Sequence, residues 1–218
     1  MLDTFLITSR ETLEASLVIG IVLSYLSKTD NNKYKKSVYY GIGLGILASI
    51  LAAFIFNHVA GGFSGRSEQI FEGVTMLLGA FLLSTMILWM MKQRHIANEI
   101  EKRVHKHISK PQPMFSYLGI FLIIFIAIIR EGVETVIFLN AIKFADGINL
   151  LGGLIGIFVA ILIGYLFFMS TKKINLKKLF KVSSILLILF AAGLVAHGVH
   201  ELEEAKILNP IIYPLYDI

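Results

Sequence analysis

Six long apolar runs constrain this chain more than any other feature of its sequence. They lie at residues 3–26, 37–59, 69–91, 114–140, 148–170 and 178–199. A helix of about 20 apolar residues spans the hydrocarbon core of a bilayer, and only helices and closed barrels satisfy their backbone hydrogen bonds in lipid. The runs are too long and continuous to be strands of a barrel. The sequence therefore predicts an all-α integral membrane protein with six transmembrane helices.

Composition supports this class of protein. Hydrophobic residues make up 56% of the 218 residues and charged residues only 16%, against about 25% charged in soluble domains. The chain contains no cysteine, which excludes disulfides, thiolate metal sites and iron–sulfur clusters.

The distribution of Lys and Arg predicts how the chain crosses the membrane. Three connections, at residues 27–36, 92–113 and 171–181, hold 15 of the 20 basic residues. Because basic loops stay in the cytoplasm, these three are expected to be cytoplasmic. The N-terminus then lies outside, in a multi-pass membrane protein. Topology thus accounts for the net charge of +5, and we expect no nucleic-acid partner.

A charged motif occurs twice inside the apolar runs. "RETLE" at residues 10–14 and "REGVE" at residues 130–134 share the pattern R-E-x-x-E, offset by 120 residues. The first lies in span one and the second in span four, so three spans form the repeating unit and the second unit is inverted. That plan is recurrent in transporters, with the site at the repeat interface.

The repeat predicts an organisation for the whole chain. We expect a first three-helix repeat at residues 1–91, a charged cytoplasmic connection at 92–113, a second, inverted repeat at 114–204 and a C-terminal tail at 205–218. Spans two and five each carry a stripe of small residues, which lets helix backbones pack closely. The stripes are Gly41, Gly45, Ser49 and Ala53 in span two, and Gly152, Gly156, Ala160 and Gly164 in span five.

The paired motifs place six ionisable side chains in the membrane. They are Arg10, Glu11, Glu14, Arg130, Glu131 and Glu134. Each costs roughly 2.5–3.5 kcal/mol at mid-membrane on insertion scales. If the two spans are antiparallel neighbours, Glu11 comes level with Glu134 and Glu14 with Glu131.

Two readings of these residues remain open. In the first, two Arg–Glu bridges only hold helices together. In the second, four carboxylates and two guanidiniums leave two negative charges, which a bound cation neutralises. Carboxylate oxygens suit hard cations, so the second reading makes Glu11, Glu14, Glu131 and Glu134 metal ligands. Arg10 and Arg130 would then orient the carboxylates.

Two further groups of polar residues lie near span ends. The predicted outer side carries Glu68, Glu72, His197, His200, Glu201 and Glu204. They form either an outer site that collects metal or an ordinary interfacial rim. The connection 92–113 has charges of both signs and predicts a solvated or surface-lying helix. Its His95, His105 and His107 offer an exit site as the alternative.

The two motifs resemble those of the iron permease family, the oxidase-dependent high-affinity iron transporters of yeasts and bacteria. "FEG" at 71–73 and "AAGLVAHGVHELEEA" at 191–205 are also similar to family segments. The resemblance covers essentially the whole chain. Family members generally have a seventh span, whereas only 14 residues follow Glu204 here.

The resemblance implies a function and a set of partners. It implies a permease, not an enzyme, that moves iron into the cell, as Fe3+ after a partner has oxidised Fe2+. Iron is the substrate, no prosthetic group is implied, and the partner is an extracytoplasmic iron-oxidising or iron-delivery protein. The motif glutamates are the implied iron ligands. Two alternatives stay open: a carrier of another hard cation such as Mn2+, and a membrane di-iron enzyme, although such centres typically use Glu-x-x-His pairs.

Overall fold

The chain folds into long helices throughout the part that the structure describes. The computed structural model describes residues 1–92, 96–108, 113–145, 147–169 and 176–208, and no strand occurs among them. The helices are α1 (Leu2–Lys28), η1 (Asn32–Tyr34), α2 (Lys35–Ala60), α3 (Arg66–Lys92), α4 (Ile96–Ile108), α5 (Pro113–Ala145), α6 (Leu150–Met169) and α7 (Leu176–Glu204). His95 and most of the predicted tail lie outside the described residues.

The prediction of an all-helical membrane protein is confirmed. Three described segments, Asn32–Ala60, Arg66–Leu88 and Ser183–Glu204, are long and apolar enough to cross a membrane, and Leu150–Leu166 is a shorter apolar helix. Each of the six predicted spans coincides with one long helix, to within five residues at either end. The seventh helix, α4, forms in the charged connection, where a surface-lying helix is predicted.

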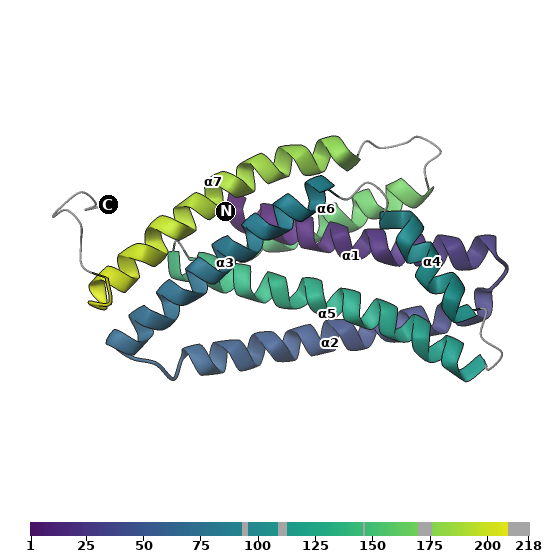
Figure 1. Cartoon of the computed structure of the whole chain (residues 1–218), viewed down its shortest axis with the longest axis horizontal. Helices are drawn as coiled ribbons and strands as arrows, with labels where there is room; N and C mark the ends of the chain where they lie inside the picture. Colours follow the sequence, from purple (N-terminus) through teal and green to yellow (C-terminus); the bar gives the residue numbers. More distant parts are fainter. Residues whose placement is uncertain (93–95, 109–112, 146, 170–175, 209–218) are drawn as a thin grey trace.

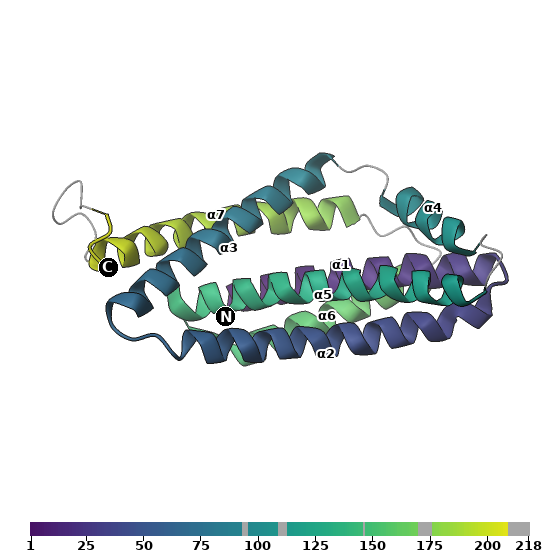
Figure 2. The ribbon, with the colours of Figure 1, turned by 60° about the horizontal axis from the view of Figure 1, so that its bottom comes forward.

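The long helices form two groups (Figures 1 and 2). In Figure 2, α3 and α7 lie on one side, while α1, α2, α5 and α6 run side by side on the other. Three helix pairs pack most extensively: α1 with α6, α2 with α5, and α3 with α7. Helix α4 lies at the end of the bundle where α1 ends and α5 begins, and it packs on both.

Small residues set the distance between helices in two of these pairs, α2 with α5 and α1 with α6, in which both helices run in the same direction. A Cβ atom built on Gly45 of α2 would lie 2.9 Å from the Ile128 side chain of α5. In the other pair, a Cβ atom on Gly156 of α6 would overlap Thr8 of α1. The Thr8 hydroxyl also donates a hydrogen bond to the Gly153 carbonyl of α6, at 3.1 Å. The small-residue stripes therefore face α5 and α1, the two helices that carry the charged motifs.

Two separate apolar clusters form the core. The first, the α3–α7 cluster, consists of Ile7, Met76, Ala80, Leu83, Ile87, Phe138, Ala141, Ile142, Leu187, Ala191 and Leu194. The second, the α4 cluster, consists of Val22, Leu26, Tyr34, Val38, Val104, Ile120, Ile124 and Ile128. On α1 and on α5 alike, the charged motif lies between residues of one cluster and residues of the other.

A pair of identical substitutions tests the close packing of α2 on α5. Gly45→Ala places a methyl group against Ile128, so we expect it to lower the free energy of unfolding by about 1–3 kcal/mol, the usual cost of overpacking. The matched control is Gly43→Ala, because nothing lies within 4 Å of a Cβ atom at Gly43. Denaturant titration of the protein in detergent measures both variants. Equal stability of the two would contradict the packing described here.

Candidate metal centre

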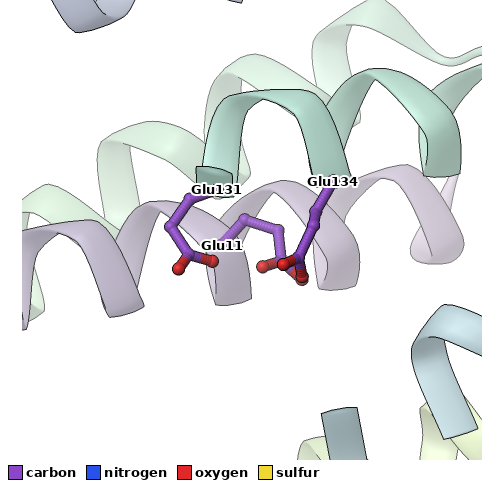
Figure 3. Close-up of side chains that lie close together, drawn as sticks. All are labelled: Glu11, Glu131 and Glu134. Carbon is purple, nitrogen blue, oxygen red and sulfur yellow. The ribbon is translucent and has the colours of Figure 1, made fainter. Parts of the chain in front are cut away.

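The two motifs meet at mid-bundle because α1 and α5 cross the protein in opposite directions. Carboxylate oxygens of Glu11, Glu131 and Glu134 all lie within 4.8 Å of one another. In Figure 3, Glu131 and Glu134 reach from one turn of α5 toward Glu11 on α1. Two of the three are well buried, since Glu11 is 1% exposed and Glu131 is 8% exposed. This group of three acidic side chains is the centre of the candidate site.

Arg10 is fully enclosed and binds two carboxylates of its own helix. Its Nη1 atom lies 3.0 Å from Glu11 Oε1, and its Nη2 atom lies 3.4 Å from Glu14 Oε1. Nη1 also donates to the Met86 sulfur of α3. The side chain of Arg10 is only 1% exposed. Helix α3 therefore covers this half of the site.

Arg130 makes the equivalent ion pairs on α5 but is far less covered. Its Nε atom lies 2.9 Å from Glu134 Oε1 and 3.7 Å from Glu131 Oε1. Its side chain is 47% exposed. The two motifs share one sequence pattern and one set of ion pairs, yet among the described residues Arg10 is enclosed while Arg130 stays half exposed.

The site has more acceptor capacity than the described donors use. Glu11 Oε2 and Glu131 Oε2 are buried, and neither accepts a hydrogen bond from any described residue. Buried carboxylate oxygens normally have partners. With Glu14 included, four carboxylates and two guanidiniums carry a formal excess of two negative charges. Such a site is suited to a cation with several oxygen ligands.

The structure differs in detail from the predicted pairing of Glu11 with Glu134 and of Glu14 with Glu131. Glu11 lies close to Glu134, as predicted, and also within 4.8 Å of Glu131. Glu14 is not one of these three; it lies one turn further along α1, with its Oε1 atom 3.4 Å from Arg10 Nη2. Its side chain is nevertheless only 14% exposed, so it lies beside the cluster and not on the protein surface.

The predicted outer residues gather at one end of the bundle. Gly73 of α3 and Gly198 of α7 approach each other closely where the two helices cross. This crossing brings the start of α3 next to the end of α7. Glu204 accepts a hydrogen bond from Gln69 at 2.8 Å and lies 3.3 Å from His200.

These outer residues are not arranged as a compact metal centre. The six are Glu68, Glu72, His197, His200, Glu201 and Glu204. Within the described part of the chain, they form no group of three ligand atoms comparable to that of Glu11, Glu131 and Glu134. The start of α3 and the end of α7 therefore carry potential metal ligands that are not gathered into one site.

Sequence reasoning missed two residues that position these groups. Met86 contacts Arg10, and Gln69 binds Glu204. A methionine within an apolar run carries no distinguishing signal. Gln69 stands next to Glu68 in "SEQIFEG", but nothing local indicates that it faces α7. Both roles follow from contacts between helices that are distant in sequence.

Comparison of this sequence with known proteins finds one matching family and several relatives. The sequence model described as the iron permease FTR1 family matches residues 1–210. The ferrous iron permease EfeU of Escherichia coli O6:H1 is 28% identical over 213 residues, covering 96% of this chain and 76% of that protein. EfeU of Yersinia pestis is 29% identical, and the match covers 100% of this chain and 79% of that protein. An uncharacterized protein of Archaeoglobus fulgidus is 31% identical, and the match covers 100% of this chain and 76% of that protein. No solved structure matches.

The unequal burial of the two arginines predicts unequal costs of losing them. Arg10→Gln leaves Glu11 and Glu14 without their buried counter-charge, so we expect it to lower the free energy of unfolding by about 3–5 kcal/mol. Arg130→Gln, the matched substitution in the second motif, should cost less, about 1 kcal/mol, because Arg130 is 47% exposed and water can partly replace it beside its two glutamates. Unfolding of the two variants in detergent measures the difference. A larger loss for Arg130→Gln would contradict the enclosure of Arg10.

Proposed function

This chain belongs to the iron permease FTR1 family, and from that premise we propose that the iron it transports binds to Glu11, Glu131 and Glu134. The family makes the chain an iron transporter in a membrane and not an enzyme. The observation that carries the proposal is the convergence of three carboxylates from α1 and α5 within 4.8 Å. Glu14 is the fourth acidic residue of the site and lies beside these three.

The chemistry of the site fits a hard cation in transit. Carboxylate oxygens bind hard metal ions well. Arg10 and Arg130 each hold two motif glutamates, which limits repulsion when no ion is bound. An ion entering the site gains oxygen ligands, and it also neutralises negative charge that is costly to bury. Binding is therefore favourable without a resident prosthetic group.

We further propose that the two motifs belong to inverted repeats with boundaries at 1–91 and 114–204. Equivalent packing supports this: Gly45 meets Ile128, and Gly156 meets Thr8. Thr8 and Ile128 are 120 residues apart, the same offset that separates the motifs. In transporters built this way, the site lies between repeats that move relative to each other.

The ligand atoms of the site bear on the oxidation state of the transported iron. An all-carboxylate site favours Fe3+, the harder ion, and this agrees with oxidation of Fe2+ by an extracytoplasmic partner. Relatives are named ferrous iron permeases, which favours Fe2+ as the ion that is supplied. Oxidation just before the ion enters the site would satisfy both.

The direction of transport follows from the charge distribution. We propose that the N-terminus, the start of α3 and the end of α7 face outward in a plasma or inner membrane. Glu68, Glu72, His197, His200, Glu201 and Glu204 would then concentrate cations at the outer mouth. A patch of acidic side chains raises the local concentration of cations and speeds their association.

Neutral isosteres of the glutamates test the site. Glu131→Gln and Glu134→Gln keep the side-chain shape but remove the charge, so we expect initial iron uptake into proteoliposomes to fall at least about tenfold, a loss of roughly 1.4 kcal/mol of binding. Glu99→Gln is the matched control, because Glu99 is exposed on α4. Uptake that is unchanged in both site variants would overturn the proposal.

The same preparation separates the alternative functions. Uptake of Fe2+, Fe3+ and Mn2+ is compared in parallel, with and without a ferroxidase outside the vesicles. We expect iron to be taken up in preference to Mn2+. A strong magnetic coupling between two bound irons would instead favour a di-iron enzyme.

Substitutions at the outer mouth should affect capture and not translocation. Glu201→Gln combined with Glu204→Gln lowers the negative charge there, so we expect the iron concentration for half-maximal uptake to rise several-fold. The maximal rate should stay unchanged, because the central site is intact. The effect should shrink at high salt, since salt screens exposed charges. A fall in the maximal rate alone would contradict a collecting role.

A further inference from the structure

The apolar α4 cluster separates the glutamates from the end of the bundle where α4 lies. On α1 its members Val22 and Leu26 follow the first motif. On α5 its members Ile120, Ile124 and Ile128 precede the second. An ion that leaves the glutamates toward this end must therefore pass an apolar section. Narrow apolar sections in channels block ions because they exclude water.

Helix α4 completes this apolar section with one fully buried side chain. Val104 is 0% exposed and packs within the cluster, while Ile100 and Ile108, one turn away on either side, pack against it. The neighbouring Arg103 is exposed. The other members of the cluster belong to α1, η1, α2 and α5. Val104 is thus the contribution of a short helix that is separate from the long spans.

Polar contacts join α4 to α1 and α5. The Tyr25 hydroxyl of α1 lies 2.9 Å from His105 Nδ1 and is exposed to solvent. Ser116 of α5 donates a hydrogen bond to the His107 carbonyl at 2.7 Å. The imidazole of His107 packs against Gly119 of α5 closely enough that a Cβ atom there would overlap it. The Tyr25–His105 contact is exposed, so water competes for it, whereas Ser116 is fully buried.

The helix faces that α4 covers are the same faces that carry the motifs. Eleven residues make three helical turns plus about 20°, and they span about 16 Å. Glu14 and Tyr25 are eleven residues apart on α1, and Gly119 and Arg130 are eleven apart on α5. Tyr25 and Gly119 both contact α4. Glu14 and the exposed side of Arg130 therefore face a strip of the bundle that ends beneath α4.

We propose that iron leaves the glutamate site along this strip, and that α4 covers the exit, with Val104, Tyr25 and His105 as the exit residues. In the closed arrangement Val104 completes the apolar barrier, and the Tyr25–His105 contact holds α4 in place. When α4 moves away, the strip below Glu14 and Arg130 becomes wet, and the ion passes Tyr25 and His105 into the cytoplasm. The proposal rests on the proposed function for its ion and on the proposed topology for its direction.

The absence of cysteine from the chain allows a direct test of the barrier. Val18→Cys introduces a single thiol one turn beyond Glu14, at a partly buried position that packs against the α4 cluster. A charged, membrane-impermeant thiol reagent is added from either side of proteoliposomes, and the rate of labelling is measured. No iron is needed, so this test is independent of the proposed function.

A substitution in α4 should open the barrier to the reagent. With Val104→Ser in the same chain, we expect labelling from the α4 side to rise about tenfold, as when the closed state loses roughly 1.4 kcal/mol. Arg103→Ser is the matched control on the exposed face of α4 and should leave the rate unchanged. Equal labelling rates in the two variants would overturn the role of Val104. Thermal unfolding of each variant checks that the protein stays folded.

Cross-linking tests whether α4 must move. Tyr25→Cys and His105→Cys are combined and joined by a bifunctional methanethiosulfonate reagent, which a reducing agent releases. We expect cross-linking to reduce iron uptake at least about tenfold and reduction to restore it. Each single-cysteine variant, treated in the same way, measures the effect of the reagent without a cross-link. Full cross-linking with unchanged uptake would overturn the proposal, even if the glutamate variants confirm the central site.

Discussion

The rest of this structure depends on bringing acidic side chains from two helices together inside an apolar bundle. Glu11 on α1 lies within 4.8 Å of Glu131 and Glu134 on α5. Carboxylates repel one another strongly where the effective dielectric constant is low. The arrangement persists because Arg10 and Arg130 each bind two glutamates, and because packing elsewhere holds the two helices. Charge that is costly without an ion becomes favourable when a cation binds.

Close packing through small residues holds α1 and α5 in place. Helices α1 and α5 each have a parallel neighbour, α6 and α2, whose stripes of small residues let the backbones approach closely. In lipid, helix association relies on such close packing and on hydrogen bonds between helices. The hydrogen bond from Thr8 to the Gly153 carbonyl adds to it. The charged helices are thus held by neighbours that carry no charge near the site.

The two apolar clusters give the site its isolation. Each motif lies between the α3–α7 cluster and the α4 cluster along its own helix. A polar centre bounded on both sides by packed apolar side chains is what alternating access requires, since only one barrier has to open at a time. The two ends differ in construction. Two long crossing helices close one, whereas a short helix contributes to closing the other.

How much the sequence alone determined can be judged from particular residues. The apolar runs specify the helices. Each run is long enough to cross a membrane, and in lipid such a segment satisfies its backbone hydrogen bonds internally by forming a helix. The two R-E-x-x-E motifs identify the six charged residues, and helical periodicity pairs each arginine with the glutamate four residues on. These features depend on local spacing, so they could be read without the fold.

Only the tertiary structure decided which of these groups meet. Glu11 approaches both glutamates of α5, while Glu14 turns to Arg10. Arg10 is enclosed at 1% side-chain exposure, whereas Arg130 is 47% exposed, although the motifs share one pattern. The contact of Met86 with Arg10 and the burial of Val104 of α4 against the long helices belong to the same class. Each depends on the crossing angle and rotation of helices distant in sequence, which local periodicity does not encode.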